Sequence, residues 1–344
     1  MRILIIGGTR FVGPYVVRYL ADAGHDVTLF HRGQTEAGLA PTVRHLYGDR
    51  HHLPDFQGEF KQLAPQVVLD MIAYTEQDAL GVMKTFKGVA ERVVALSSAD
   101  VYRAYGYLLR LQSGLPDVVP LSEDAPLRDH LYPYRTKAAG PDDDLYDYEK
   151  ILVERAVMSD AQLPGTILRL PAVYGPGDFQ HRLFEYVKRM DDGRPVVLLE
   201  EARSRWRWTR GDVESVAYAI TLAVTDERAS GRIYNVGEKE SLTEAEWVRA
   251  VGHAAGWKGE VIAVPKDFLP GRMIAGDFAL EHHLVVDTSR IRRELGYSEQ
   301  VSRDDALKLC VEWERTHPPE KIDPQQFDYA AEDAVLEKLE NLAQ

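Results

Sequence analysis

Residues 1–13 read MRILIIGGTRFVG, so an apolar run that ends at Ile6 is followed at once by a glycine-rich turn, GGTRFVG, at positions 7–13. A strand, a glycine-rich turn and then a helix form the usual cradle for a dinucleotide pyrophosphate. The glycines can supply a tight bend, a close approach of backbone to phosphate, and a close contact of helix and strand. By itself, the turn is also compatible with a plain strand-to-helix connection. We expect seven cofactor contacts from it: Gly7, Gly8, Thr9, Arg10, Phe11, Val12 and Gly13.

Further short apolar runs follow this turn along the chain. They are VTLF (27–30), VRHLYGD (43–49), VVLDMIA (67–73), VVALSS (93–98) and TILRL (166–170), and segments of helical length separate them. Continuous apolar strands that alternate with helices indicate a parallel sheet covered on both faces. The predicted fold class is therefore α/β, with a doubly wound, Rossmann-like parallel sheet.

The same pattern indicates how the chain divides. Residues 1–174 are predicted to form an NAD(P)-binding Rossmann domain and residues 175–320 a smaller C-terminal substrate-binding lobe, with residues 212–237 returning to the main sheet. A charged helical pattern predicts a helical tail at 321–344. Residues 103–145 are weakly periodic and rich in Pro, Asp and Arg, and connections of that length are usually functional or disordered.

Composition limits the classes of function. The formal net charge of −13 argues against binding to a nucleic-acid backbone, which needs a basic face. The single cysteine, Cys310, excludes an internal disulfide bond and a multi-cysteine metal site. Adjacent histidines, as in His51-His52 and His282-His283, point to different sides of their segments, so no metal is expected. A strand pattern from residue 3 leaves no secretory signal, and no apolar stretch could span a bilayer, so we expect a cytoplasmic protein without membrane contact.

The second strand bears on the choice of cofactor. NAD sites commonly place an acid at the end of this strand, whereas NADP sites use a cation. Here the strand is followed by His31 and Arg32, and Arg32 could clamp a 2′-phosphate together with Arg10. We therefore favour NADP over NAD, the alternative being two solvated arginines. Asp49, after the third strand and next to Arg50, could accept a hydrogen bond from adenine or cap a helix.

The stretch YDYEK at 146–150 carries the candidate chemistry. A helix predicted at 146–158 would place the Tyr146 phenol and the Lys150 ammonium on one face, four residues apart. The cation favours the phenolate, so Tyr146 could exchange a proton with a substrate oxygen, while Lys150 bonds the nicotinamide ribose. Ser98 or Ser97, which end the fifth strand, could hold that oxygen. A Tyr-x-x-x-Lys pair alone is common by chance.

The chain contains, in this order, the stretches GGTRFVG, GDR, SSADVY, YDYEK, RLPAVYGPGD, RGDVESVAYAI, YNVG and DTSRIRRELGY. Together they resemble the extended short-chain dehydrogenase/reductases, the NAD(P)-dependent epimerase/dehydratase family. The resemblance covers nearly the whole chain. It implies an enzyme with Ser98 in the catalytic serine/threonine position, Tyr146 as acid/base and Lys150 as its partner. It also implies a homodimer, with helices around 76–89 and 146–158 as candidates for the interface. Further cofactor contacts are expected from strand ends, with the last three implied by the resemblance: Ile72, Ala73, Leu96, Leu170, Pro171 and Val173.

The chain departs from the family pattern in three places. Arg10 replaces the second glycine of the Gly-x-x-Gly-x-x-Gly turn, a version that resembles an atypical branch with plant plastid stem-loop RNA-binding relatives. Ala172 stands where many members that act on sugar nucleotides carry an asparagine that contacts substrate phosphates. The 48 positions between Ser98 and Tyr146 exceed the usual spacing, so the extra chain should lie over the substrate pocket.

Three functions remain open. The leading hypothesis is an NAD(P)-dependent sugar-nucleotide epimerase or dehydratase-like enzyme, with Arg210 and Arg290 or Arg292 as candidates to pair the substrate phosphates. Asp100 could supply the carboxylate that dehydration needs, or could simply cap a loop or helix. The second hypothesis is an NADPH-dependent reductase of a non-nucleotide carbonyl compound. The third, an RNA-binding or regulatory protein on the same scaffold, is disfavoured by the net charge.

Overall fold

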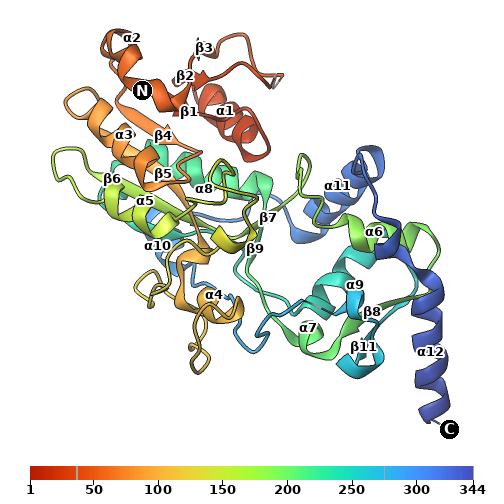
Figure 1. Ribbon diagram of the computed structural model, residues 1–344. Helices are drawn as coiled ribbons and strands as arrows, with labels where there is room; N and C mark the ends of the chain where they lie inside the picture. Colours follow the sequence, from red (N-terminus) through yellow and green to blue (C-terminus); the bar gives the residue numbers. More distant parts are fainter. Residues whose placement is uncertain (36–37, 275, 344) are drawn as a thin grey trace.

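The computed structural model describes residues 1–35, 38–274 and 276–343. A seven-stranded parallel sheet forms its centre, in the order β10-β6-β5-β4-β1-β2-β3 (Figure 1). The strands are β1 (Arg2–Ile6), β2 (Asp26–His31), β3 (Arg44–Tyr47), β4 (Val67–Asp70), β5 (Arg92–Ser98), β6 (Gly165–Leu170) and β10 (Ile233–Asn235). The predicted doubly wound α/β class is confirmed.

Helices cover both faces of this sheet. Alternate residues of β1 point to opposite faces, so that Ile3 and Ile5 pack with one set of helices and Leu4 and Ile6 with the other. The first set is α1 (Val12–Asp22), α8 (Val213–Thr225) and α10 (Ser289–Leu295). The second is α2 (Gln57–Leu63), α3 (Glu76–Phe86) and α5 (Lys150–Val157). Both faces are therefore buried, which explains why the strands read as continuous apolar runs.

The C-terminal half builds a second apolar cluster beside the sheet (Figure 1). Its elements are α6 (Phe184–Asp191), β8 (Val196–Glu200), α7 (Glu201–Arg205), α9 (Glu244–Ala255), β11 (Glu260–Val264) and α11 (Arg303–Thr316). Strand β8 pairs with β11, and a separate pair, β7 (Ala172–Tyr174) with β9 (Arg210–Asp212), follows β6. Because β10 belongs to the main sheet, the chain returns there from the second cluster through α8.

Two segments lie outside these layers. Residues 103–145 contain helix α4 (Arg103–Leu108), and their apolar side chains pack in a cluster of their own with Ile151, Trp206 and Trp208. The chain ends in α12 (Tyr329–Ala343), which extends away from the body (Figure 1). The last residue of the predicted tail, 344, lies outside the described residues. Within the described ranges, no helix is both long enough and apolar enough to cross a bilayer.

One predicted boundary is wrong. The helix expected at 146–158 is α5, and it begins at Lys150 rather than at Tyr146. The carboxylate of Glu149 caps its first turn by accepting a hydrogen bond from the Ile151 amide, and Glu149 itself has extended backbone. Tyr146 and Lys150 therefore do not share a helix face.

Candidate active site

A cavity of about 690 Å³ opens at the carboxyl ends of the central strands. Strand order reverses between β1 and β4, and the crevice at such a point is where ligands bind in doubly wound sheets. Most predicted cofactor contacts line this cavity: Gly7, Gly8, Thr9, Arg10, Phe11, Val12, His31, Arg32, Asp49, Arg50, Ile72, Leu96, Leu170, Pro171 and Val173. Ser98 lines it as well. Four predicted residues are not among the lining residues: Gly13, Ala73, Tyr146 and Lys150.

The opening turn has the backbone shape that a dinucleotide needs. Gly7 and Gly8 have φ of +89° and +86°, a region that side chains with a Cβ rarely adopt. A Cβ on Gly13 would lie 2.3 Å from the Gly8 carbonyl oxygen, so the third glycine allows helix and turn to touch. No side chain caps the start of α1, which leaves the Val12 amide available to an anion, whereas the Gly13 amide donates to the Arg10 carbonyl oxygen and Pro14 has no N–H. The turn therefore fits a bound pyrophosphate.

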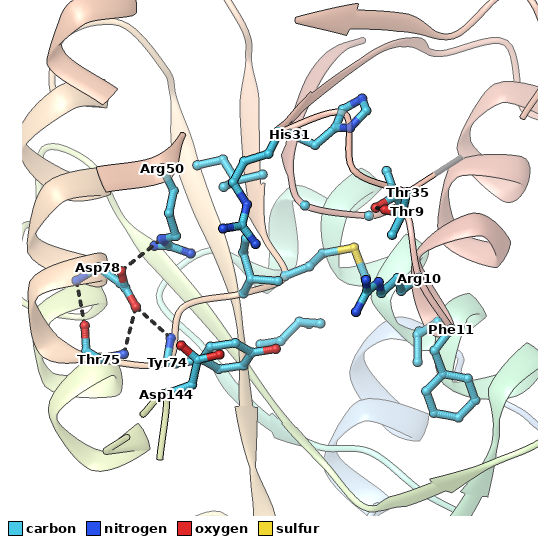
Figure 2. A pocket seen from close by; sticks show the side chains of 18 of the residues that line it. Thr9, Arg10, Phe11, His31, Thr35, Arg50, Tyr74, Thr75, Asp78 and Asp144 are labelled. Atoms are coloured by element: carbon cyan, nitrogen blue, oxygen red, sulfur yellow. Dashed lines mark hydrogen bonds and ion pairs between the residues drawn. The ribbon is translucent and has the colours of Figure 1, made fainter. Parts of the chain in front are cut away.

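Two arginines lie on the β1–β2 side of the cavity. Arg10 and Arg32 both line it, and neither has an ion-pair partner among the described residues. Figure 2 shows Arg10 and Phe11 across the cavity from Arg50 and Asp78. The hydroxyls of Thr9 and Thr35, 2.5 Å apart, join the glycine turn to the loop after β2. This wall can accept an anionic group beside the ribose.

The two residues Asp49 and Arg50, which follow β3, form a helix cap and a buried ion pair. The Asp49 carboxylate accepts a hydrogen bond from the His51 amide at 2.9 Å, which is the capping role that the sequence left open. Arg50 makes two hydrogen bonds to Asp70, at 2.9 and 3.0 Å, and its Nε lies 3.0 Å from Asp78 (Figure 2). The Arg50 charge is thus neutralised within the protein.

Lys150 lies buried beneath the cavity. Its Nζ donates to the carbonyl oxygens of Ala73, at 2.5 Å, and Leu96, at 3.1 Å. Burial lowers its pKa to about 8. Because Leu96 lines the cavity, the ammonium lies directly behind its wall. The structure therefore brings Lys150 close to the cofactor site.

Tyr146 does not lie beside Lys150. Its ring packs under the Arg135 guanidinium, 4.7 Å from the ring centroid, and Arg135 also donates to the Tyr146 carbonyl oxygen at 3.0 Å. Arg135 is held in turn by Asp147. Lys150 lies instead over the rings of Tyr74 and Tyr148, at 5.0 and 5.5 Å. The tyrosine rings beside Lys150 are thus those of Tyr74 and Tyr148 rather than that of Tyr146.

The segment before α5 depends on one buried ion pair. Arg128 and Glu149 have fully buried side chains and lie 3.0 Å apart. Arg128 also donates to the Asp100 carbonyl oxygen, and Glu149 accepts from the Tyr132 amide. These bonds tie the 103–145 segment to the end of β5 and to the start of α5.

The end of that segment forms one wall of the cavity. Pro141, Asp142, Asp143, Asp144 and Asp147 line it. Among the described residues, this wall contributes carboxylates and no cation to the lining. The end of the extra chain thus lies at this cavity as an acidic wall, and its position over a substrate pocket stays a prediction.

The three arginines considered for substrate phosphates are engaged with carboxylates. Arg210 pairs with Glu244 at 2.5 Å and lies 4.3 Å from the centre of a tryptophan ring. Arg290 pairs with Asp124, and Arg292 pairs with Glu299 at 2.6 Å. None of the three lines the cavity.

Sequence reasoning missed Tyr148, Glu149 and Arg128. Arg128 is an isolated cation in a weakly periodic segment, so no pattern marks it. A carboxylate just before a helix is a capping signal, and Glu149 could have been read as one. Tyr148 lies inside the quoted YDYEK motif but off the Tyr-x-x-x-Lys spacing.

The chain is similar to a known protein family and to individual known proteins. The model of the NAD dependent epimerase/dehydratase family matches residues 3–237. The chain is 27% identical over 288 residues to a 2′-dehydrokanamycin reductase of Streptomyces kanamyceticus, covering 82% of this chain and 74% of that one. It is 24% identical over 321 residues to the chloroplast stem-loop binding protein of 41 kDa b of Arabidopsis thaliana, covering 89% and 77%.

Solved structures share the fold. A UDP-glucose 4-epimerase of Thermotoga maritima superposes with a TM-score of 0.66 at 18% identity, covering 92% of this chain and 99% of that one. A dTDP-glucose 4,6-dehydratase of Bacillus anthracis superposes with a TM-score of 0.67 at 17% identity, covering 92% and 97%.

Proposed function

The chain belongs to the NAD dependent epimerase/dehydratase family and is an NAD(P)-dependent enzyme, and from this premise we propose that it transfers hydride reversibly at a sugar-like carbinol or carbonyl carbon held at Ser98. One observation carries the proposal. The glycine turn and Ser98, the last residue of β5, line the same cavity. The cofactor would supply the hydride donor or acceptor.

The chain's own residues divide the remaining tasks. The amides of the glycine turn would hold the pyrophosphate, and Lys150 would orient the nicotinamide ribose from behind Leu96. Ser98 would bind the reacting oxygen, and a tyrosine near Lys150 would complete the proton transfer. The wall at 141–147 would cover the bound substrate and exclude water.

A sugar nucleotide is the first candidate substrate. The family description and the similarity to a UDP-N-acetyl-alpha-D-glucosaminuronate decarboxylase of Bacillus cytotoxicus, 21% identical over 339 residues, support it. Epimerisation or dehydration of such a substrate would return the cofactor to its starting state.

Reduction of a non-nucleotide carbonyl compound is the second candidate, and the charges of the site favour it. Substrate phosphates need unpaired cations, but Arg210, Arg290 and Arg292 are already paired with carboxylates. The 141–147 wall adds further negative charge. A neutral or cationic sugar would suit this wall better than a diphosphate, and a 2′-dehydrokanamycin reductase is among the relatives.

The amount of NADPH consumed in the reaction distinguishes the two substrate classes. The purified protein would be incubated with NADPH and either free keto sugars or UDP- and dTDP-sugars. A reductase should oxidise one NADPH for each alcohol formed, whereas an epimerase or dehydratase should convert the sugar nucleotide without net cofactor consumption. A protein that binds NADPH but performs neither reaction would contradict the proposed hydride transfer.

Arg10 offers a test of cofactor choice. We expect Arg10→Gly to weaken NADPH binding by about tenfold or more, because a charge-assisted bond to the 2′-phosphate contributes about 1.5–3 kcal/mol. NADH binding should change little, since NADH lacks that phosphate. Fluorescence titration of both dinucleotides measures the two effects in one variant. Equal weakening of both would mean that Arg10 does not contact the 2′-phosphate.

A further inference from the structure

Asp100 lies behind the part of the cavity that Ser98 lines. Its side chain is buried, and the hydroxyls of Tyr134 and Tyr148 both donate to Oδ2 at 3.0 Å. The other oxygen, Oδ1, has no hydrogen-bond partner among the described residues. Leaving a charged carboxylate oxygen buried and unpaired is costly. Burial accordingly raises the pKa of Asp100, against the opposing effect of Arg128.

Tyr148 connects Asp100 to Ser98. Its hydroxyl donates to Asp100 at 3.0 Å, and the Ser98 side chain lies near enough to lower the pKa of this phenol against the larger effect of burial. The Ser98 hydroxyl caps the turn that holds Asp100, accepting from the Asp100 amide at 3.2 Å, and it lines the cavity. Ser98, Tyr148 and Asp100 thus form a path from the cavity wall to a buried carboxyl group.

We propose that Asp100 and Tyr148 form a proton relay behind Ser98, in place of a direct transfer from Tyr146. The proposal rests on the hydride transfer proposed above. The Tyr146 ring is engaged with Arg135, outside the cavity lining, whereas Tyr148 lies beside Lys150 and behind Ser98.

The proton balance is simple. In the direction of reduction, hydride adds to the carbonyl carbon as its π bond to oxygen breaks, and Ser98 gives its hydroxyl proton to that oxygen. Tyr148 reprotonates Ser98, and the carboxylic acid of Asp100 reprotonates Tyr148, which reverses the direction of their hydrogen bond. Asp100 is left as a carboxylate and must then regain a proton from solvent; its other hydrogen-bond partner, the Tyr134 hydroxyl, is in turn bonded to the Tyr105 hydroxyl. Oxidation runs the same steps backwards.

Burial favours the neutral form of Tyr148. It raises the pKa of the phenol well above the usual value, so Tyr148 carries a proton at neutral pH. The Tyr74 ring lies 6.0 Å away and the Tyr134 ring 5.2 Å away, and Lys150 lies over one face. A protonated phenol can pass on a proton in either direction, as a relay requires.

Infrared spectroscopy tests the buried acid without any substrate. The difference spectrum between wild type and Asp100→Asn at neutral pH should contain the carbonyl-stretch band of a protonated carboxyl group, and Tyr148→Phe should shift that band. Absence of the band would overturn the relay even if the protein reduced a carbonyl probe. The band in a protein that converts none of the keto sugars, UDP-sugars or dTDP-sugars named above would count against the proposed function instead.

Two matched variants test the relay in catalysis, with whichever of those keto sugars or sugar nucleotides the wild-type protein converts as the substrate. We expect Tyr148→Phe to lower kcat by about 100-fold or more, with unchanged NADPH affinity, since a positioned acid or base contributes about that factor. Tyr146→Phe removes the same hydroxyl from the same segment and should retain the wild-type kcat. Asp100→Asn should lower kcat like Tyr148→Phe. A loss in Tyr146→Phe equal to or greater than that in Tyr148→Phe would overturn the relay.

Discussion

Replacing Gly13 with alanine is expected to abolish binding of both NADPH and NADH. The added Cβ would lie 2.3 Å from the Gly8 carbonyl oxygen and 2.4 Å from its carbonyl carbon. Both are backbone atoms, so no side-chain rotation relieves the clash, and the turn must move away from α1. We also expect the free energy of unfolding to fall by about 3 kcal/mol. Titration with each dinucleotide and urea unfolding measure the two effects.

Gly81→Ala is the matched control. Gly81 lies inside α3, and nothing lies within 4 Å of the position that its Cβ would occupy. Alanine favours a helix over glycine by about 1 kcal/mol, so this variant should be slightly more stable and bind cofactor normally. If Gly13→Ala bound NADPH as tightly as Gly81→Ala does, the glycine turn would not be the pyrophosphate site.

Removal of the Arg128 guanidinium should be the most destabilising change in the region around Asp100 and the start of α5. Arg128→Met would leave the Glu149 carboxylate buried without its partner, in a pair whose side chains are both fully buried. Breaking such a pair from one side typically costs about 3–5 kcal/mol. It would also free the Asp100 carbonyl oxygen and loosen the cap of α5. We expect a large fall in the unfolding midpoint and increased hydrogen exchange at residues 130–150.

Arg228→Met controls for the loss of an arginine ion pair as such. Arg228 pairs with Asp226 on the surface, where its side chain is 67% exposed, and such pairs contribute little. This variant should show no measurable change in stability. A similarly small effect of Arg128→Met would mean that the 103–145 segment is held mainly by its apolar contacts.

The fold could be predicted because its signals are local. Each central strand is a short apolar run that needs burial on both faces, and the intervening segments have helical length. The glycine spacing also predicted a tight backbone bend, which Gly7 and Gly8 make with positive φ, although the turn alone was equally compatible with a plain strand-to-helix connection. Both predictions concern features that a few neighbouring residues determine.

The positions of Tyr146 and Lys150 could not be predicted in the same way. Spacing states which residues would share a helix face, but not where the helix begins. Here Glu149 sets the first turn, and the Glu149 side chain is fixed by Arg128, which lies 21 positions earlier in a segment without clear periodicity. Likewise, the sequence offered Arg210 as a phosphate ligand because it could not show the Glu244 carboxylate beside it. Such pairings depend on tertiary contacts.

Calorimetric titration of the wild-type protein, freed of nucleotide, with NADPH and then NADH tests the central claim most directly. We expect one dinucleotide site in each chain, with NADPH bound more tightly than NADH. A folded protein that binds neither dinucleotide would contradict the assignment of the cavity to a nicotinamide cofactor, and with it the proposed hydride transfer.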